Sequence, residues 1–498
     1  MKGGIIETWV PKPVDIVVMN PPYVRQESIP EDSKKYYTSN YNIDRKSDLY
    51  CYFVLRALKL INQNGVISVI SSDKWLETGY GEDLQAFLVN RLTGIYGQRE
   101  RTFGADVNSI IFVYGSETDN SKKTDFIYLE SYSSLSVRNH VVFQRKDLIP
   151  GKWFYLRAPK MFMEKIYPKL THKLGDFAKI KRGFTTGAND FFYMKDVSAS
   201  YEVDYLSDPK KFEDLGVNAK NEKELNEEGL IYIENEGRER FVLEKSSTLP
   251  IIRSIKKHDR PHLMKKPETL CFYISGKKRD CPFTSKYISF GEGKKISVIR
   301  GKHRTTITGY NNIQTLKNRT PWFSLRNIVP TNIFLPVLFS TRFLSFYSDE
   351  GLLADQVLEY AYPKYLKGSE VKGLALYLNS TLHFLMLELW SPRMGGGALH
   401  PNAIIYKTIP MPKIDIVLTC FEHIYFGDRP TLDYKDELLQ RDKLELDQAL
   451  LQGLGFEGEE LHSTLETLYK EYTDLVEDRL VKADKGLKSQ ENMNEQDN

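Results

Sequence analysis

The first 115 residues alternate between short apolar runs and stretches whose apolar residues recur at helical spacing. Apolar runs predict buried strands, and the spacing of Leu55, Leu58 and Ile61 predicts a helix that ends at Asn64-Gly65, because glycine is a common helix stop. In chain order, we expect a strand at 15–19, a helix at about 49–61, a strand at 66–70, a helix at about 81–91, and β segments at 95–96 and 109–114. Strands that alternate with helices predict an α/β fold for residues 1–115.

The rest of the chain divides into three further parts. Residues 116–170 mix polar and aromatic positions and predict a connecting segment. Within residues 171–415, the acidic stretch at 203–245 predicts an insertion or a surface lobe. Within residues 416–498, leucines at helical spacing predict helices over 435–485, and the polar end predicts a disordered tail.

Composition narrows the class of protein. A chain of 498 residues with 41% hydrophobic residues can form the cores of two or three domains. We find no apolar run long enough to span a membrane and no signal-peptide pattern at the start of the chain. The four cysteines lack metal-ligand spacing, so we expect reduced thiols, no metal site and a cytoplasmic location: Cys51, Cys271, Cys281 and Cys420.

The net charge of +3 conceals a strong asymmetry. Residues 250–330 carry 18 Lys/Arg against 4 Asp/Glu, whereas residues 431–498 carry 8 against 18. The basic excess predicts a surface for a polyanion. The alternative is a solvated basic face, but such faces usually interleave acidic residues. We expect four lysines to contact double-stranded DNA: Lys256, Lys257, Lys294 and Lys295.

The strand expected at 15–19 runs directly into Asn20-Pro21-Pro22-Tyr23. This tetrapeptide resembles the catalytic motif of the adenine-N6 DNA methyltransferases. Asn-Pro-Pro is also ordinary turn chemistry after a strand. However, the carboxyl edge of a parallel sheet is where such folds bind ligands, which favours the functional interpretation.

The chemistry of adenine methylation accounts for these residue types. The lone pair of the exocyclic amine is delocalised into the ring, so two acceptors on its N–H groups would return electron density to nitrogen. The resemblance implies that the side-chain oxygen of Asn20 is one acceptor and that a carbonyl of Pro21 or Pro22 is the other. Proline adds no competing N–H. Tyr23 offers a face on which a flipped-out adenine stacks.

The order of elements is similar to the second half of a gamma-class DNA methyltransferase domain. Residues 48–53 resemble the motif whose aromatic residue lies near the cofactor's adenine, and Phe53 is the matching position. Residues 101–107 resemble the motif whose Phe packs against the flipped base, and Phe103 matches it. The alternative for both rings is core packing. The resemblance implies S-adenosylmethionine as the methyl donor, with Pro22 and Phe53 beside it.

A second resemblance begins near residue 179. Residues 179–193 are similar to the opening of the target-recognition domain that follows such methyltransferases in type II and type IIG restriction–modification enzymes and in some phage-defence methylases. Residues 319–325 and 378–399 resemble later blocks of the same domain. The glycines at 395–397 allow close backbone approach or form a flexible loop. The resemblance implies that residues 171–415 recognise the target DNA.

A complete enzyme of this kind also needs a glycine-rich strand–turn–helix for the cofactor and an acidic residue for its ribose. We find neither, since Gly3-Gly4 follows no strand and begins no glycine pattern. Three βα units of roughly 30 residues each are therefore missing, and the strand at 15–19 becomes a bare apolar edge. We expect a shortened chain or one half of a split enzyme, with an upstream methyltransferase half as its partner. We find no nuclease signature.

These patterns lead to one main hypothesis and two alternatives. The expected fold is α/β: the C-terminal half of a Rossmann-like methyltransferase domain, an α+β target-recognition domain and a helical C-terminal segment. The expected function is site-specific adenine-N6 methylation of double-stranded DNA in a restriction–modification or phage-defence system. One alternative is a DNA-recognition subunit without catalysis of its own. The other is methylation of a substrate other than DNA, against which the long basic segment argues.

Overall fold

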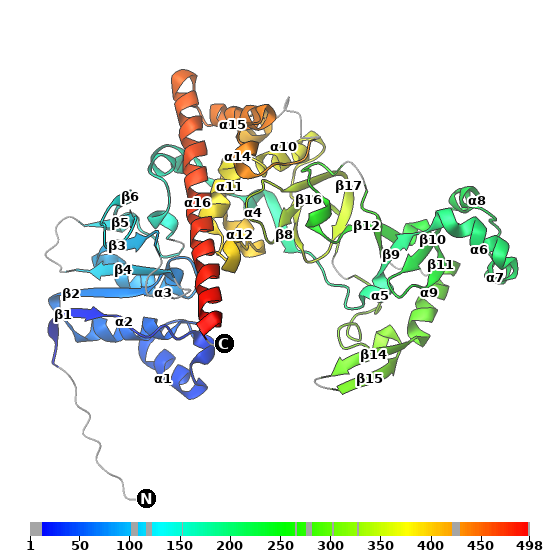
Figure 1. The fold of residues 1–498 in the computed structure, drawn as a ribbon, viewed down its shortest axis with the longest axis horizontal. Coiled ribbons are helices and arrows are strands. Elements are labelled where there is room, and N and C mark those ends of the chain that lie inside the picture. The colour runs from blue at the N-terminus through cyan, green and yellow to red at the C-terminus, as the bar shows by residue number, and fades with distance from the viewer. Residues whose placement is uncertain are drawn as a thin grey trace, which may run out of the picture.

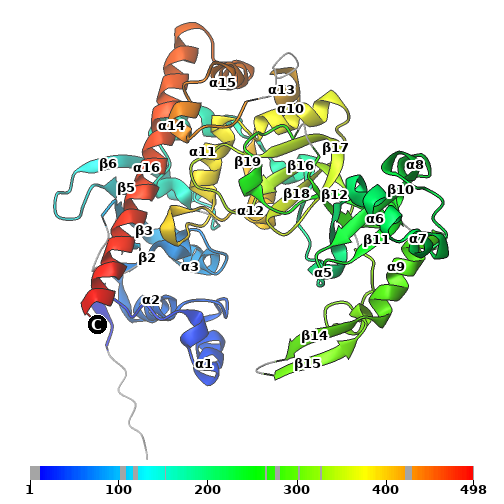
Figure 2. The same ribbon diagram turned by 45° about the vertical axis from the view of Figure 1, so that its right-hand side comes forward.

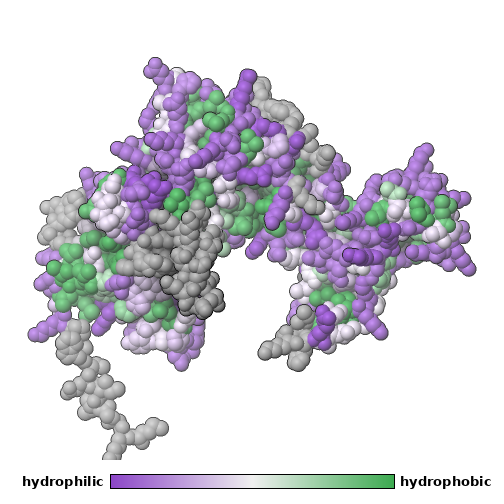
Figure 3. Space-filling model, in the orientation of Figure 1, coloured by the Kyte–Doolittle hydropathy of each residue, from purple (hydrophilic) through white to green (hydrophobic). Residues whose placement is uncertain are grey.

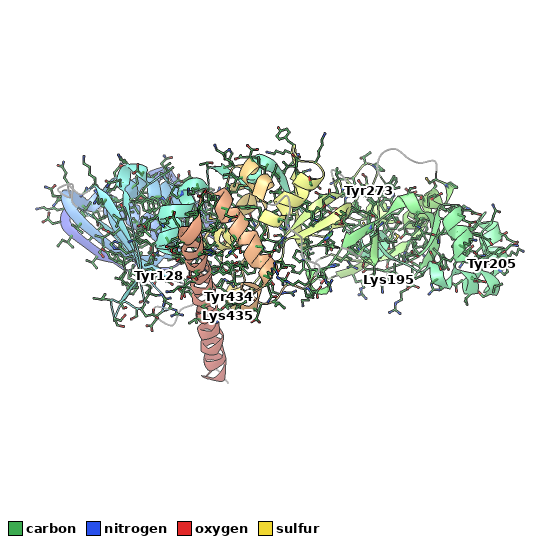
Figure 4. All side chains as sticks on the ribbon, turned by 90° about the horizontal axis from the view of Figure 1, so that it is seen from above. Tyr128, Lys195, Tyr205, Tyr273, Tyr434 and Lys435 are labelled. Atoms are coloured by element: carbon green, nitrogen blue, oxygen red, sulfur yellow. The ribbon has the colours of Figure 1, made fainter. Side chains whose placement is uncertain are left out.

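The chain forms three parts that lie in a row (Figure 1). Seen from above (Figure 4), Tyr128 marks a six-stranded sheet at one end, Tyr434 a helical middle part, and Tyr205 the outer arm at the other end. The computed structural model describes residues 12–100, 108–115, 122–151, 153–263, 266–274, 281–300, 303–325, 328–420 and 429–496.

The first part is a mixed sheet in the order β1-β2-β4-β3-β5-β6. Its strands are β1 (Val14–Met19), β2 (Ile61–Ser72), β3 (Leu92–Gln98), β4 (Ser109–Tyr114), β5 (Lys123–Leu129) and β6 (Val137–Gln144). β1, β2, β3 and β5 run parallel to one another, whereas β4 and β6 run antiparallel to their neighbours. The helices are α1 (Glu31–Tyr41), α2 (Leu49–Leu60) and α3 (Gly81–Leu88). The mixed α/β class expected from the sequence is therefore confirmed.

The core of this part lies between the sheet and its helices. Val54 and Leu55 of α2 are buried with Ile67 and Val69 of β2 and with Phe112 of β4. These strand residues are two apart because only alternate positions face the helices. Burial of each large apolar side chain contributes about 1.5–3 kcal/mol, which explains why the apolar runs specify these strands.

β1 is an edge strand that exposes apolar side chains. It stands at one end of the strand order, and Ile16 is 70% exposed and Val18 77% exposed. Side chains two residues apart share one face of a strand, so Val14, Ile16 and Val18 form an apolar row. Figure 3 shows apolar surface at this end of the molecule. The bare apolar edge expected from the sequence is thus present among the described residues.

Two local features differ from the sequence expectations. α2 ends at Leu60 and β2 follows at once, so Asn64-Gly65 lies inside β2 rather than at a helix end. Gly65 is needed there because a Cβ would come within 2.8 Å of the Asp15 carbonyl oxygen on β1. β5 and β6 come from the expected connecting segment, and they extend the first sheet. The domain boundaries themselves stay predictions.

A nine-stranded sheet connects the middle part with the outer arm, in the order β11-β10-β9-β13-β12-β17-β16-β18-β8. The bounds of its strands are β8 (Ala178–Arg182), β9 (Tyr193–Asp196), β10 (Leu230–Asn235), β11 (Arg240–Glu244), β12 (Thr248–Ile252), β13 (Thr269–Phe272), β16 (Thr331–Pro336), β17 (Phe346–Ala354) and β18 (Leu358–Pro363). β7 (His172–Lys173) pairs with β19 (Pro410–Met411). The helices around these strands are α4 (Leu174–Phe177), α5 (Asn189–Phe192), α10 (Ser369–Tyr377), α11 (Thr381–Trp390), α12 (Ala403–Thr408) and α13 (Ile414–Cys420).

The outer arm carries two extensions. The acidic stretch forms α6 (Tyr201–Ser207), α7 (Pro209–Asp214) and α8 (Glu222–Glu227), which pack with β10 and β11 around a core of their own. This matches the surface lobe expected at 203–245. The second extension is α9 (Pro282–Gly293), followed by a separate two-stranded ribbon of β14 (Lys295–Arg300) and β15 (His303–Thr308). In Figures 1 and 2 this ribbon forms the lower end of the arm.

Three C-terminal helices complete the middle part: α14 (Tyr434–Glu437), α15 (Arg441–Gly453) and the long α16 (Gly458–Gln496). Helices occur within 435–485, where the leucine spacing predicted them, and α16 continues to Gln496, where the polar end of the sequence predicted a disordered tail. Arg479 of α16 is buried and donates from Nε and Nη2 to the carboxylate of Glu388 on α11, at 2.9 and 2.7 Å. In the part of the chain that the structure describes, no helix has the length and apolarity of a membrane span.

Candidate active site

The loop that follows β1 places residues 20–23 at the carboxyl edge of the first sheet. β1 runs parallel to β2, with Met19 opposite Val69, so Asn20 begins beside the end of β2. Pro21 is buried and anchors the loop, whereas Asn20 and Pro22 are exposed. An exposed amide at the end of a parallel strand is free to meet a ligand at this edge.

Tyr23 is partly covered, with 36% of the residue exposed. Burial raises the pKa of its phenol above the ordinary value, so the ring stays neutral at physiological pH. A neutral aromatic ring with an open face is suited to stacking on a base.

Asp48 ties the loop to the start of α2. One carboxylate oxygen accepts a hydrogen bond from the Gln26 amide at 2.9 Å, and the other accepts from the Tyr80 hydroxyl at 3.1 Å. The Leu49 amide donates to the Val24 carbonyl oxygen at 3.0 Å. Burial raises the pKa of Tyr80, which keeps its hydroxyl protonated as a donor. The loop is therefore held on its C-terminal side by a side chain that precedes α2.

The same edge carries a polar pocket that joins two parts of the chain. Gln98 at the end of β3, Ser109 at the start of β4 and Tyr128 of β5 line it from the first sheet, and Arg393 enters from the segment after α11. The pocket measures about 20 Å³, which is about the space of one water molecule. Burial, and then the nearby Arg157, lower the pKa of Arg393 to about 10. The middle part thus contacts the carboxyl edge of the first sheet directly.

Of the two predicted aromatic site residues, the structure describes Phe53 but not Phe103. Phe53 is 45% exposed and lies one helical turn after Leu49, whereas its neighbours Tyr52 and Val54 are buried. Core packing therefore does not account for Phe53, and its role beside a cofactor stays a prediction. Phe103 lies outside the described residues. The strands before and after it, β3 and β4, end and begin at the same sheet edge as the loop.

The four predicted DNA-contacting lysines lie in two places: Lys256 and Lys257 follow β12, which pairs with β17, whereas Lys294 and Lys295 lie at the base of the β14–β15 ribbon. Lys256 and Lys295 are exposed. Lys294 forms an ion pair with Glu239, and its ammonium lies 5.2 Å from the centre of the Phe290 ring. A paired lysine has less charge available for a phosphate, so Lys294 is a weaker candidate than Lys295. Lys257 lies in a short helical turn, and its side chain is outside the described part.

Sequence reasoning missed the residues that hold the loop in place. Asp48 has a local signal, because Asp before an apolar helical run is a typical N-cap residue. In the structure its side chain instead bonds to Gln26 and Tyr80. Tyr80 has no local signal, because its contact joins positions 32 residues apart.

Known proteins share the segment that carries this loop. Residues 9–94 match the model of the Eco57I restriction-modification methylase family. Residues 9–94 are thus similar to the restriction-modification methylases of that family. The expected resemblance to the methyltransferases of restriction–modification systems is thereby confirmed. The match includes the whole of β1, the loop, α2 and β2.

Two curated relatives extend this likeness beyond residues 9–94. The type II methyltransferase M.BstVI of Geobacillus stearothermophilus is 32% identical over 220 residues, which cover 39% of each chain. The type II methyltransferase M.AccI of Acinetobacter calcoaceticus is 21% identical over 371 residues, which cover 68% of this chain and 58% of that protein. The chain thus spans less than two thirds of the length of either relative. The solved type IIG restriction endonuclease BpuSI is 13% identical with a TM-score of 0.41, over 94% of this chain and 54% of that one.

Proposed function

We propose that this chain is the catalytic and DNA-recognition portion of an adenine-N6 DNA methyltransferase of a restriction–modification system. The observation that carries the proposal is the placement of Asn20, Pro22 and Tyr23 at the carboxyl end of β1 within residues 9–94. S-adenosylmethionine supplies the methyl group when it is bound. The basic arm contributes the DNA-binding surface.

Each residue of the loop has a distinct task. The Asn20 side-chain oxygen and a carbonyl of the Pro21-Pro22 step accept from the two N–H groups of the target amine. They localise its lone pair on nitrogen and later stabilise the positive charge until a proton leaves to solvent. Tyr23 stacks on the extruded adenine, and Phe103 braces it. No strong general base is required for this chemistry.

The exposed apolar surfaces beside the loop suit one side of a nucleoside cofactor. The Phe53 ring and Pro22 are both exposed near the start of α2. Apolar and aromatic surface of this kind is typical of small-molecule sites. The ribose and the methionine part need further groups, which we assign to a completing half of the enzyme.

We also propose that βα units with the glycine-rich cofactor turn complete the sheet at β1, in the same polypeptide or as a separate chain. The row of Val14, Ile16 and Val18 supports this, because an apolar edge in water favours pairing with another strand. Adding that half should raise the melting temperature of the chain and restore cofactor binding, measured by calorimetric titration. An unchanged melting temperature would contradict the proposal.

The Asn20→Ala variant tests catalysis in the completed enzyme. Methyl transfer from tritiated S-adenosylmethionine should fall roughly 100- to 1,000-fold, as is typical when one transition-state hydrogen bond is removed. Affinity for duplex DNA should stay within about twofold, because the basic arm is unchanged. Activity within a few-fold of wild type would refute the role of Asn20.

A DNA-recognition subunit without catalysis is the second candidate, because the basic arm is formed while β1 is an edge strand among the described residues. A 2-aminopurine at the target position distinguishes the two. Extrusion of the base should increase its fluorescence with the completed enzyme, and a small residue at Tyr23 should alter that signal. A recognition subunit would bind DNA without changing the fluorescence.

A further inference from the structure

The ribbon of β14 and β15 stands apart from both larger sheets and ends the outer arm. Its sequence from 294 to 308 contains five Lys/Arg and one His, and no Asp or Glu. Exposed basic strands without interleaved acids are unusual for a merely solvated surface. The charge of the ribbon is therefore complementary to a polyanion.

The pairing of the two strands gathers exposed polar side chains on one face of the ribbon, called here its polar face, which Ile299 shares by register. Ser297 lies directly opposite Thr306, and Lys295 lies opposite Thr308. Opposite residues of an antiparallel pair share a face, and all four of these residues are exposed. Arg304 is exposed two positions before Thr306, so its side chain belongs to the same face.

The opposite face is apolar at its base. Ile296 lies opposite Ile307, both are partly buried, and Ile296 packs against the core of the arm. This contact turns the polar face outward and fixes which side chains can meet a ligand. One face of the ribbon therefore packs against its own domain, and the other face is exposed to a ligand.

The base of the ribbon is held firmly. The Gly309 amide donates to the Lys294 carbonyl oxygen at 2.7 Å, which closes the two strands. The Tyr310 hydroxyl donates to Asp190 at 2.6 Å, and the Trp322 indole donates to Glu292 of α9 at 2.9 Å. Gly309 has φ +83°, and a Cβ there would lie 2.6 Å from the Glu292 carbonyl oxygen, so glycine is required at this turn. Side chains on a braced element can be placed accurately against a partner.

The space-filling view shows that the molecule arches over an open hollow between the first sheet and the arm (Figure 3). In Figures 1 and 2 the ribbon lies on the arm's side of this hollow and extends toward the side of α1. A two-stranded ribbon fits the major groove of B-DNA, which is about 12 Å wide. Six residues per strand extend about 20 Å, which is roughly the length of six base-pair steps.

We infer that the β14–β15 ribbon enters the major groove of duplex DNA and contacts base edges with its polar face. This rests on the proposed function and assigns sequence specificity to particular residues. The hydroxyls of Ser297 and Thr306 bond to base edges, and the Thr306 methyl group packs on a thymine methyl. Arg304 donates to guanine, and Lys295, at the base of the ribbon, contacts phosphate. Arginine to guanine and threonine to thymine are frequent contacts in this groove.

The test uses the full chain and a pool of duplexes with randomised centres. Wild type should enrich a defined motif, and fluorescence anisotropy should give its affinity for that motif and for a scrambled duplex. Ser297→Ala, Thr306→Val and Arg304→Gln should each reduce base preference at one or two adjacent positions by roughly ten- to a hundredfold, with about twofold change on the scrambled duplex. Thr306→Val keeps the shape and strand propensity of the residue, so it preserves the fold. Lys210→Ala, on α7 of the outer arm, is the matched control and should change neither the base preference nor the affinity for the scrambled duplex.

Each outcome decides between the claims. Unchanged base preferences in all three variants would overturn the assignment of the ribbon while leaving DNA binding intact. Loss of affinity for every sequence alike would show phosphate contact only and would also overturn base contact by these residues. If wild type binds DNA but enriches no motif, base contact by these residues is likewise overturned. Failure of wild type to bind any duplex would instead refute the proposed DNA substrate.

Discussion

Replacement of Asp48 by alanine should loosen the loop that follows β1 without removing any of the proposed catalytic residues. The carboxylate accepts from the Gln26 amide at 2.9 Å and from the Tyr80 hydroxyl at 3.1 Å. A hydrogen bond to a charged group contributes about 1.5–3 kcal/mol, and partial exposure of Asp48 favours the lower end. We therefore expect Asp48→Ala to lower the free energy of unfolding of the first part by about 2–4 kcal/mol.

Two further variants help to separate the contributions. Asp48→Asn keeps an oxygen that can accept from the Gln26 amide and should cost about 1 kcal/mol. Tyr80→Phe removes the bond to Asp48 together with the 2.9 Å hydrogen bond between the Tyr80 and Tyr50 hydroxyls, and should cost about 1–2 kcal/mol. Asp32 on α1 is the matched control, because its side chain is fully exposed and its contact with Lys35 is a surface pair. Asp32→Ala should change stability by less than about 0.5 kcal/mol.

Methyl transfer by the completed enzyme should fall more than stability alone explains. Displacement of a reacting group by about 1 Å can cost roughly 100-fold in rate, and Asn20 lies only six residues before Gln26. Hydrogen exchange of the loop amides, chemical unfolding and the transfer assay measure the three effects. If Asp48→Ala and Asp32→Ala show the same hydrogen exchange of the loop amides and the same rate of methyl transfer, the Asp48 carboxylate does not position the loop.

Three further predictions concern other parts of the chain. Glu471 of α16 accepts from the Met161 amide at 3.1 Å, and burial raises the pKa of its carboxyl to about 7 from an ordinary value near 4.5, so its contribution is present below about pH 4.5 and is lost as pH rises through about 7. In thermal unfolding, the stability of Glu471→Gln relative to wild type should therefore increase between pH 5 and pH 8. A difference between the two melting temperatures that does not change with pH would contradict this. Arg479→Ala should lower the unfolding free energy by about 3–5 kcal/mol, because it leaves Glu388 buried and unpaired. The double variant Arg479→Met with Glu388→Leu should lower it less, and the reverse order in urea titrations would exclude that explanation. Neutralising Lys256 and Lys257 should weaken binding to all duplexes alike and flatten the slope of log affinity against log salt by roughly 0.9 per lost contact, and an unchanged slope would assign the pair to a solvated surface.

The sequence by itself determined the local features of the site. An apolar run followed by Asn20-Pro21-Pro22-Tyr23 specified β1 and the loop at its carboxyl end, because a strand of alternating faces and a Pro-Pro turn depend on adjacent residues. The helical spacing of Leu55 and Leu58 specified α2 for the same reason. The basic excess in 250–330 was also visible in the chain itself.

Only the tertiary structure decided the features that depend on distant residues. Gly65 lies in a strand rather than at a helix end because the backbone of Asp15 approaches it closely. Glu239 pairs with Lys294 across 55 positions and leaves Lys295 as the better candidate for DNA. The register of β14 with β15 places Ser297 opposite Thr306 on an exposed face. Strand pairing, ion pairs and close backbone contacts join residues far apart in sequence, and no local pattern of apolar and polar positions specifies which partner each residue meets.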